Sequence, residues 1–378
     1  MAAEVVILGG GVGGTIVANL VAKKSSEKAH VTVVDTTGIH VYQPGFLYVA
    51  VGQEQPSALQ RPERSLLRDD VTLVIDQATK VDTVARKVLL ESGRVLPYDQ
   101  LLLATGSRTV MDEIPGAGDA FDFYTMSGAV RLSEALEAFE GGAIVIGVAG
   151  IPYKCPPAPV EFVFLLDDYL RSRGLREKCE IKLLSPLNRA FTIEATSKLV
   201  QPILAERGIE LTGFFNVESV DPDARTVHSL EGETVAYDLL VLVPPHRGQK
   251  VIEDSALGDE RGWVPVDKNT LKHTQFDHIW AVGDTTNIPI SKSGSVAHYE
   301  ASVAAEAIVA AVRGEAPPKH TYDGKVTCFL ETGHGEATTI QFDYDHPPVS
   351  PTPARRWHWA KALFNKTYWH TVPQGRLP

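Results

Sequence analysis

The sequence predicts an α/β fold made of two related parallel-sheet domains and a short C-terminal region. Residues 5–35 read as strand, glycine-rich turn, helix and strand. A similar order of segments begins again near the middle of the chain. Matching landmarks are separated by matching distances, since Gly9 precedes Tyr98 by 89 positions and Gly147 precedes Tyr237 by 90. The repeat therefore indicates two tandem Rossmann-like domains.

The first glycine-rich turn has the spacing of a dinucleotide-binding unit. Gly9 allows the tight turn, Gly11 lets the backbone approach a pyrophosphate, and Gly14 lets the helix pack against the strand. The N-terminus of the helix predicted over residues 15–24 offers N–H groups and a partial positive charge to phosphates. Asp35 ends the second strand, where a carboxylate can accept hydrogen bonds from ribose hydroxyls.

The rest of the first domain supplies further candidate contacts. The turn-rich loop around Pro44 lies beside the expected cofactor crevice, and a buried strand ends at Thr105 and Gly106. We expect a helical stretch over residues 64–68. We expect an antiparallel meander from four short segments, residues 71–75, 78–82, 87–90 and 95–98.

The second copy differs from the first where its chemistry would differ. Four prolines fall within residues 152–159, and proline removes N–H donors that a dinucleotide would need. Ser185 stands where the first copy has Asp35. We predict a strand over 181–185, a helix over 160–173 and a meander over 209–235. The second domain is therefore expected to keep its fold, lose its dinucleotide and present Cys155.

The chain then returns to the first domain. Asp284 follows Gly283 and suits a sugar-like hydroxyl, and a helix predicted over residues 295–313 can direct its positive end at an anionic group. Strands within residues 320–345 carry Cys328. The predicted domains are residues 1–108 with 236–313, residues 109–235, and a C-terminal region over 314–378.

The tail has apolar and aromatic residues at helical spacing, with cations beside them. The first group is Trp357, Ala360, Leu363, Phe364, Thr367 and Tyr368, and the cations are Arg355, Arg356, Lys361 and Lys366. Two interpretations stay open: a helix packed on the core, or an anchor at a lipid boundary, where tryptophan and basic residues are favourable.

Composition limits the partners. The chain has 47 acidic and 36 basic residues and a formal charge of −11, which argues against nucleic acid. No run reaches the roughly 18–20 apolar residues of a spanning helix. The first strand is expected within four residues of Met1, so we expect no signal peptide and a peripheral membrane protein on the cytoplasmic side. Three cysteines are too few for a disulfide framework. We expect no metal site, and the oligomeric state, including a homo-oligomer, is left open.

Several motifs together resemble known flavoproteins. The segments 9–35, 104–106 and 282–284 are similar to the FAD-binding signature of the flavoprotein disulfide reductases with two dinucleotide domains. Within that group the chain resembles sulfide:quinone oxidoreductase and its relative, the flavoprotein subunit of flavocytochrome c sulfide dehydrogenase. The motifs that carry this second resemblance are Lys154–Glu161, Pro289–Gly294 and Thr327–Phe329. The resemblance extends from Val5 to about Trp369.

The resemblance implies an FAD enzyme with a redox pair, Cys155 and Cys328, which are 173 positions apart. Sulfide attacks their disulfide and leaves a persulfide on one cysteine, and the released thiolate, Cys328 in this interpretation, passes two electrons to the flavin. Glu161 shuttles protons, and Lys292 places a positive charge near the pyrimidine side of the flavin. The electron acceptor is then a membrane quinone.

Aromatic residues such as Phe329, Phe364 and Tyr368 are candidates to line a quinone slot on the opposite face of the flavin.

Three alternatives remain at this point. A flavocytochrome-type enzyme would pass electrons to a cytochrome, but the loop around Tyr42 has no cysteine for a covalent flavin bond. An NADH:quinone reductase would need the dinucleotide that the second turn is expected to have lost. A flavin-containing sulfur carrier would not be an enzyme. Residues 121–126 also lack the third cysteine of many quinone-reducing members, and Cys179, at the start of a strand, is expected to pack.

Overall fold

A five-stranded parallel sheet forms the first half of the protein. The computed structural model describes residues 2–375, and within them this sheet has the strand order β19-β9-β1-β2-β5. Its strands are β1 (Ala3–Leu8), β2 (Ala29–Asp35), β5 (Val71–Ile75), β9 (Gln100–Leu103) and β19 (Ile279–Ala281). The carboxyl ends of parallel strands meet at one edge, where ligands of such sheets bind.

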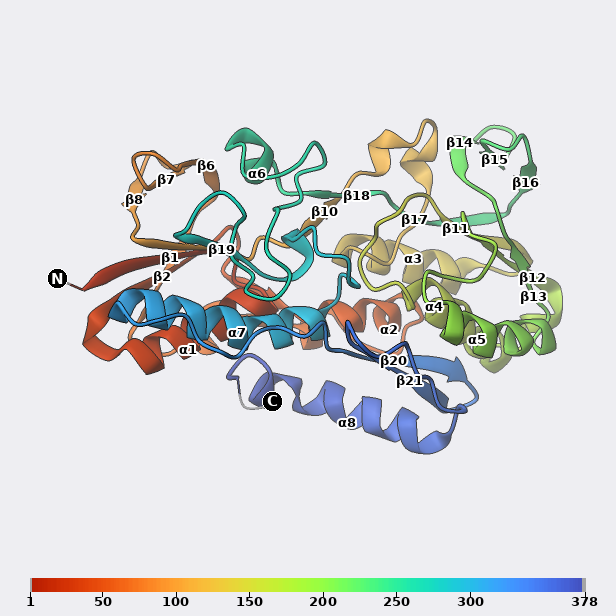
Figure 1. The fold of residues 1–378 in the computed structure, drawn as a ribbon. Coiled ribbons are helices and arrows are strands. Elements are labelled where there is room, and N and C mark those ends of the chain that lie inside the picture. Colours follow the sequence, from red (N-terminus) through yellow and green to blue (C-terminus); the bar gives the residue numbers. More distant parts are fainter. Residues whose placement is uncertain (1, 376–378) are drawn as a thin grey trace.

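Two long helices cover one face of this sheet. Helix α1 (Val12–Ser25) and helix α7 (Gly294–Arg313) lie against each other beneath the strands (Figure 1). Both begin at the carboxyl edge of the sheet, because α1 follows β1 and α7 follows the turn after β19. Their N-terminal ends therefore point toward the same crevice.

The second half contains a four-stranded parallel sheet with the order β13-β12-β11-β17. Its strands are β11 (Gly142–Val148), β12 (Cys179–Leu184), β13 (Ile209–Thr212) and β17 (Leu239–Val243). Its helices are α3 (Met126–Ala138), α4 (Ala158–Ser172) and α5 (Glu194–Glu206). The predicted fold class, two tandem Rossmann-like units, agrees with this arrangement.

Three expectations about strand membership were wrong. Strand β5 belongs to the first parallel sheet and β13 to the second, so the antiparallel meanders are shorter than predicted. The short segments alone could not reveal this, because parallel pairing depends on distant residues. Strand β17 pairs with β11 in the second sheet, although the predicted boundary at residue 236 assigned it to the first domain.

The smaller elements lie around the two sheets. The meanders are β6 (Ala78–Asp82), β7 (Lys87–Leu90) and β8 (Val95–Pro97), and β14 (Val217–Asp221), β15 (Thr226–Ser229) and β16 (Thr234–Ala236). Two further strand pairs are β3 (Ile39–Val41) with β4 (Gln60–Pro62), and β10 (Ser107–Thr109) with β18 (His246–Gly248). Short helices are α2 (Phe46–Ala50) and α6 (Lys250–Asp254). The helical stretch expected over 64–68 is only a single 3₁₀ turn, Glu63–Ser65.

The C-terminal region lies beneath both halves. The hairpin β20 (Val326–Gly333) and β21 (Glu336–Phe342) is followed by helix α8 (Arg355–Thr371), which packs along β21 (Figure 1). Helix α8 buries Lys361 and Tyr368, whereas Trp359 and Leu363 are 66% and 63% exposed. Among the described residues, no helix is long and apolar enough to cross a membrane.

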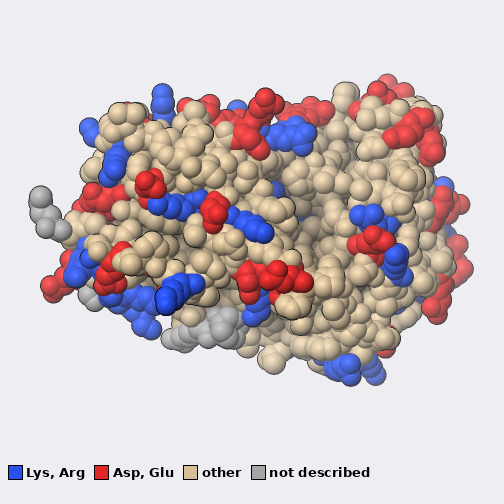
Figure 2. Space-filling view, viewed as in Figure 1, with Lys and Arg blue, Asp and Glu red and all other residues tan. Residues whose placement is uncertain are grey.

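The surface carries charges of both signs. Figure 2 shows lysine and arginine interspersed with acidic residues on the viewed face, and acidic residues gathered near the meander β14–β16 at its right-hand end. No continuous basic stripe crosses this face.

Candidate active site

The first glycine turn has the geometry that a dinucleotide requires. Gly9 has a φ of +105°, and a Cβ there would lie 2.4 Å from the carbonyl oxygen of Ala104. A Cβ on Gly14 would lie 1.9 Å from the carbonyl oxygen of Gly9, so only glycine lets α1 pack this close to β1. At Gly11, by contrast, a Cβ would meet nothing within 4 Å. The turn is therefore closed on its protein side and open at Gly11, where a pyrophosphate can approach.

Asp35 has a local role that the sequence did not reveal. One carboxylate oxygen accepts a hydrogen bond from the Gly10 N–H at 2.9 Å. The other accepts from the backbone N–H groups of Thr37 and Gly38 at 2.9 and 2.7 Å. Asp35 thus joins the end of β2 to the glycine turn, and a ribose hydroxyl would share these oxygens.

Thr105, Gly106, Gly283 and Asp284 converge at the opposite side of the crevice. The hydroxyl of Thr105 is 3.2 Å from that of Thr285, so the turns after β9 and β19 touch. Gly106 and Gly283 have φ values of +65° and +76°, which glycine adopts without strain. Burial raises the pKa of Asp284, and the charges of Lys154 and Lys292 oppose this shift.

Lys292 is held in the loop before α7. Its ammonium group donates to the backbone carbonyls of Asp284 and Thr286 at 2.9 and 2.6 Å, and it lies 3.9 Å from the centroid of the Trp263 ring. The side chain is buried, and this burial lowers its pKa to about 8, while the charges of Asp284 and Glu300 oppose the shift. The predicted cation is therefore present beside the carboxyl edge of the first sheet.

Glu300 is a buried acid that sequence reasoning missed. One oxygen accepts the Gly283 N–H at 2.5 Å, and the residue has no exposed surface. Burial raises the pKa of Glu300 to about 8, and the neighbouring Asp284 adds to this effect. Its position in the middle of a helix of small apolar residues gave no signal for this contact.

Cys155 and Cys328 both lie near the start of α7. The Cys155 N–H donates to the carbonyl oxygen of Lys292 at 2.6 Å, and Cys328 Sγ lies 3.9 Å from the hydroxyl of Ser295. Both thiols are free and partly buried. Burial raises the pKa of both, and the charge of Cys328 raises that of Cys155 further. Cys155 has a φ of +52°, an unusual value for a residue with a side chain.

Glu161 forms a buried ion pair with Lys361. The carboxylate lies in the first turn of α4, and the ammonium group comes from α8, 200 positions later. Glu161 and Lys361 are 2% and 7% exposed. Burial raises the pKa of Glu161. Burial alone would lower that of Lys361, but the carboxylate of Glu161 reverses this, and the pKa of Lys361 lies well above its ordinary value. Both charges act on Cys155 and Cys328.

Further aromatic and acidic side chains surround the ion pair of Glu161 and Lys361. Lys361 lies 5.4 Å from the centroid of the Tyr48 ring, and the Tyr48 hydroxyl donates to Glu331 at 3.3 Å. His358, also on α8, is 3.0 Å from the same carboxyl group. Lys361, one of the four cations of the tail, thus pairs with Glu161 inside the protein.

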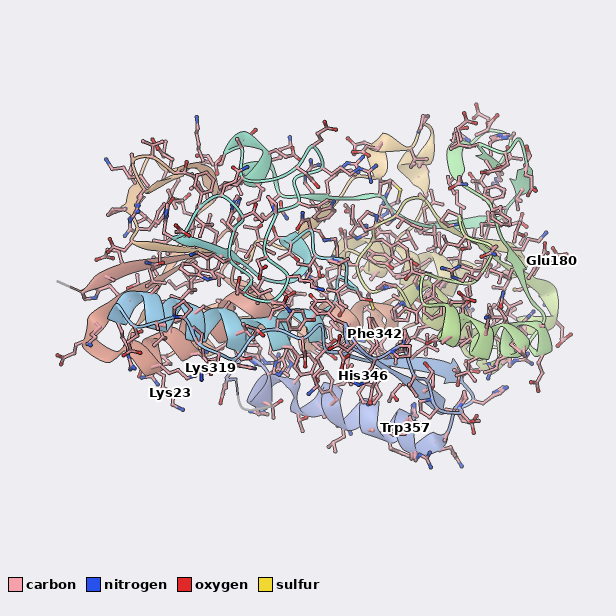
Figure 3. All side chains as sticks on the ribbon, in the orientation of Figure 1. Lys23, Glu180, Lys319, Phe342, His346 and Trp357 are labelled. Carbon is pink, nitrogen blue, oxygen red and sulfur yellow. The ribbon has the colours of Figure 1, made fainter. Side chains whose placement is uncertain are left out.

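A cavity of about 700 Å³ is lined by residues that stand close to Cys155 in the sequence. Tyr153 and Pro156, which flank the cysteine, line it together with Lys292, Trp263 and Phe342. Figure 3 shows Phe342 at the end of β21, near the middle of the molecule. The lining combines aromatic surface with two cations, Lys292 and Arg261, and one acid, Asp259.

The second glycine turn has a different structure from the first. A Cβ on Gly150 would lie 3.4 Å from Pro245. Ser185 is buried and donates to the Arg189 carbonyl oxygen at 2.6 Å, so protein atoms use the position of the missing acid. Cys179 is buried at the start of β12, in agreement with the expected packing role.

Pro44 and the aromatic candidates also have defined places. Pro44 lies in the 3₁₀ turn Gln43–Gly45, and the neighbouring Gln43 accepts a hydrogen bond from Lys154 at 2.8 Å. The rings of Phe329 and Phe364 are 6.4 Å apart. Tyr368 is buried, with 2% of its surface exposed.

An open glycine turn, two cysteines near the start of α7 and a buried acid together are typical of a redox enzyme. Residues 3–306 match the pyridine nucleotide-disulphide oxidoreductase family, and the chain belongs to that family. Membership implies a flavin cofactor.

Known proteins resemble the chain over nearly its full length. It is 27% identical over 362 residues to a mitochondrial sulfide:quinone oxidoreductase of Mus musculus, with 93% of this chain and 80% of that protein covered. It is 27% identical over 391 residues to the corresponding protein of Dictyostelium discoideum, with 99% and 86% covered. The structure matches the X-ray structure of the sulfide:quinone oxidoreductase from Aquifex aeolicus with a TM-score of 0.90 at 24% identity, covering 100% of this chain and 93% of that one. The resemblance and the fold class predicted from sequence are thereby confirmed.

Proposed function

We propose that this protein is an FAD-dependent enzyme that oxidises sulfide at Cys155 and Cys328 and passes the electrons to a membrane quinone. The observation that carries this proposal is that two cysteines from distant segments both lie near the start of α7, where the charges of the buried pair Glu161 and Lys361 act on both. Similarity to sulfide:quinone oxidoreductases supports it.

The crevice of the first domain suits FAD. The turn from Gly9 to Gly14 and the N-terminus of α1 would hold the pyrophosphate, and Asp35 would share its carboxylate with a ribose hydroxyl. Thr105, Gly106, Gly283 and Asp284 would line the flavin half of the site, with Pro44 at its rim. When bound, the flavin accepts two electrons from the cysteine pair and gives them to the quinone.

Lys292 would stabilise negative charge at the end of the crevice. Its ammonium group is held by two carbonyl oxygens and lies in a buried position, where a fixed charge acts more strongly than in water. The N-terminus of α7, which begins two residues later, adds a partial positive charge.

The cysteines would act as a dithiol–disulfide couple. Joining the two sulfurs releases two electrons and two protons. Sulfide, as HS⁻, then attacks the disulfide, so that one sulfur–sulfur bond breaks, another forms as a persulfide, and the second cysteine leaves as a thiolate. Over a full cycle HS⁻, one proton and a quinone give sulfane sulfur and a quinol, which balances atoms, charge and electrons.

Glu161 and Lys361 would stabilise the thiolates and exchange protons with them during these steps. Burial raises the pKa of both thiols, so each thiolate needs a nearby cation or a proton acceptor. Lys361 supplies the cation, since its charge opposes the shift at both cysteines. Glu161 can exchange a proton with a sulfur and is linked through Lys361 to Tyr48 and Glu331.

The outer face of α8 suits a membrane surface. Trp359 and Leu363 are largely exposed one turn apart, and Arg355, Arg356 and Lys366 on the same helix are also exposed. Apolar side chains flanked by basic ones favour the boundary of an anionic bilayer. The two interpretations of the tail are thus compatible, because one face of α8 packs on the protein and the other faces outward. Phe329 and Phe364 are the candidates for the quinone slot.

Anaerobic addition of sulfide to the purified flavoprotein tests the proposal. The flavin absorbance should bleach in the wild type, and it should remain oxidised in Cys155→Ser and Cys328→Ser. Cys179→Ser is the matched control and should bleach like the wild type, because this buried cysteine lies outside the pair. Equal bleaching in all four proteins would contradict the assigned cysteine pair.

A further inference from the structure

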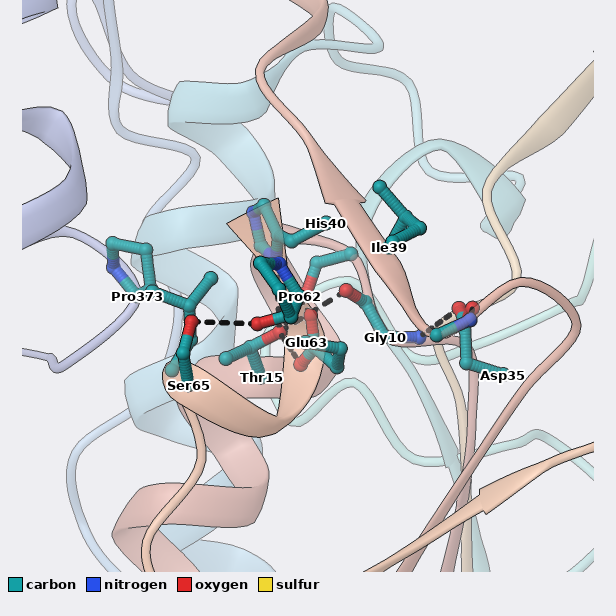
Figure 4. A network of polar contacts seen from close by, with 12 residues as sticks. Gly10, Thr15, Asp35, Ile39, His40, Pro62, Glu63, Ser65 and Pro373 are labelled. Atoms are coloured by element: carbon teal, nitrogen blue, oxygen red, sulfur yellow. Dashed lines mark hydrogen bonds and ion pairs between the residues drawn. The ribbon is translucent and has the colours of Figure 1, made fainter. Parts of the chain in front are cut away.

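A fully buried chain of hydrogen bonds links the first glycine turn to α8. Thr15, on α1, donates its hydroxyl to Glu63 Oε1 at 2.6 Å, and His40 Nδ1 lies 3.0 Å from Glu63 Oε2. His40 Nε2 is 2.8 Å from the hydroxyl of Tyr368. Figure 4 shows Thr15, Glu63 and His40 clustered beside Gly10. The four side-chain-bonded residues are at most 2% exposed.

The directions of the hydrogen bonds in this chain depend on which ring nitrogen of His40 carries the hydrogen. A carboxylate only accepts, so both Thr15 and His40 Nδ1 donate to Glu63. When Nδ1 carries the hydrogen and donates to Glu63, Nε2 can accept a hydrogen bond from the Tyr368 hydroxyl. Because these side chains are buried, water cannot replace a partner that is lost. Loss of one member leaves another buried group without its hydrogen bond.

At one end, Glu63 supports the turn that would hold the pyrophosphate. A Cβ built on Gly10 would lie 3.1 Å from Glu63 Cγ and Cδ and from Asp35 Oδ2. The Thr15 hydroxyl is also 2.9 Å from the carbonyl oxygen of Gly11. The carboxyl group of Glu63 therefore packs directly behind the glycine turn, on the side away from the open space at Gly11.

At the other end, Tyr368 fixes α8 to the first domain. Its ring lies 4.3 Å from that of Tyr42, whose hydroxyl donates to Asn365 on α8 at 2.6 Å. Beyond the helix, the Pro373 carbonyl oxygen accepts from Asn19 on α1 at 3.0 Å. Lys361 lies seven residues before Tyr368 on the same helix, about two turns away. The docking of α8 therefore sets where Lys361 meets Glu161.

We propose that Glu63, His40 and Tyr368 are positioning residues that couple FAD binding to the docking of α8. The proposal rests on the proposed function for the identity of the cofactor and for the role of Lys361. In this proposal, bound FAD orders the glycine turn, and the ordered turn holds Thr15 and Glu63 in place. The hydrogen bonds of His40 to Glu63 and Tyr368 then hold Tyr368, and with it α8, in its docked position. By linkage, docking of α8 strengthens FAD binding by the same factor by which FAD strengthens the docking of α8.

The test compares Tyr368→Phe with Tyr322→Phe in two measurements. Tyr322 is the matched control, because it is also 2% exposed and its hydroxyl donates to the Lys325 carbonyl oxygen at 3.0 Å, far from this chain. FAD affinity is measured by titrating the apoprotein and following flavin fluorescence. Docking is measured by amide hydrogen exchange of residues 355–371 with and without FAD.

Tyr368→Phe should weaken FAD binding about tenfold, whereas Tyr322→Phe should leave it unchanged. In the wild type, removal of FAD should speed exchange across residues 355–371, and in Tyr368→Phe the holoprotein should already exchange faster. Glu63→Gln combined with Tyr368→Phe should weaken FAD binding by less than the product of the two single effects, because both act on one chain.

Wild-type affinity in Tyr368→Phe, or exchange of α8 that does not respond to FAD, would overturn the coupling. The proposed function fails in a different way: FAD binds and the coupling is present, but sulfide does not bleach the flavin. A wild-type chain that binds no FAD overturns both.

Discussion

Replacement of Lys361 by methionine removes the cation from a buried ion pair and keeps the length of the side chain. Glu161 is 2% exposed, and its carboxylate would be left without a partner that carries the opposite charge. In such a position the group takes up a proton, because an unpaired buried charge is more costly than a neutral acid.

The size of the effect follows from the ordinary pKa of Glu161, which is 4.5. Holding this group protonated at pH 7 costs about 1.36 kcal/mol for each of about 2.5 pH units, or roughly 3.4 kcal/mol. Breaking a buried ion pair by removing one partner costs about 3–5 kcal/mol in other proteins. We therefore expect Lys361→Met to lose about 3 kcal/mol of unfolding free energy at pH 7.

The loss should depend on pH in one direction. Burial raises the pKa of Glu161 in the folded variant above its unfolded value of 4.5. The folded state of the variant is therefore destabilised most at a pH where this carboxyl group is ionised in the unfolded chain. The difference from the wild type should be largest at neutral pH and shrink as the pH falls toward 4.5. Urea unfolding followed by tryptophan fluorescence between pH 4.5 and 7.5 measures this difference.

The double variant Glu161→Gln with Lys361→Met is the matched control. It carries neither charge, so it should recover to within about 1 kcal/mol of the wild type. If the unfolding free energy of Lys361→Met lies within about 0.5 kcal/mol of the wild-type value at every pH, Glu161 and Lys361 do not form a buried ion pair.

Four further predictions concern the glycine turn, Lys292 and the exposed face of α8. Gly11→Ala should fold normally and bind FAD at least tenfold more weakly, since its Cβ meets no protein atom but occupies the expected place of the pyrophosphate. Gly14→Ala should lower the melting temperature, because its Cβ would lie 1.9 Å from a backbone oxygen. Lys292 has a pKa of about 8, so its charge is present below that pH and lost above it; sulfide-dependent flavin reduction should fall through about pH 8, and this limb should be absent in Lys292→Met. Trp359→Glu with Leu363→Glu should abolish sedimentation with anionic vesicles, while reduction of a water-soluble quinone should continue at the wild-type rate.

Local signals were sufficient to predict the two Rossmann-like units. Glycine spacing, alternating strand and helix segments, and the repeat of Gly9–Tyr98 in Gly147–Tyr237 are properties of short stretches or of their distances. The sheets to which β5, β13 and β17 belong could not be predicted in this way. A parallel strand pairs with residues far along the chain, and no local pattern identifies the neighbouring strand.

The site was predicted only in part for the same reason. Cys155, Cys328, Lys292 and Glu161 carried recognisable motifs, whereas the partner of Glu161 did not. Lys361 stood in the sequence among Arg355, Arg356 and Lys366, and only the docking of α8 selects it for burial. His40 lies in the three-residue strand β3 and Glu63 in a single 3₁₀ turn, and elements this short carry no periodic signal. Buried acids and histidines are nevertheless costly unless they are paired.

Steady-state reduction of a soluble ubiquinone analogue by sulfide, under anaerobic conditions, tests the central claim most directly. The account predicts turnover in the wild type and in Cys179→Ser, no turnover in Cys155→Ser or Cys328→Ser, and no quinone reduction when NADH replaces sulfide. Quinone reduction that is driven by NADH, or by sulfide in the absence of Cys155, would contradict it.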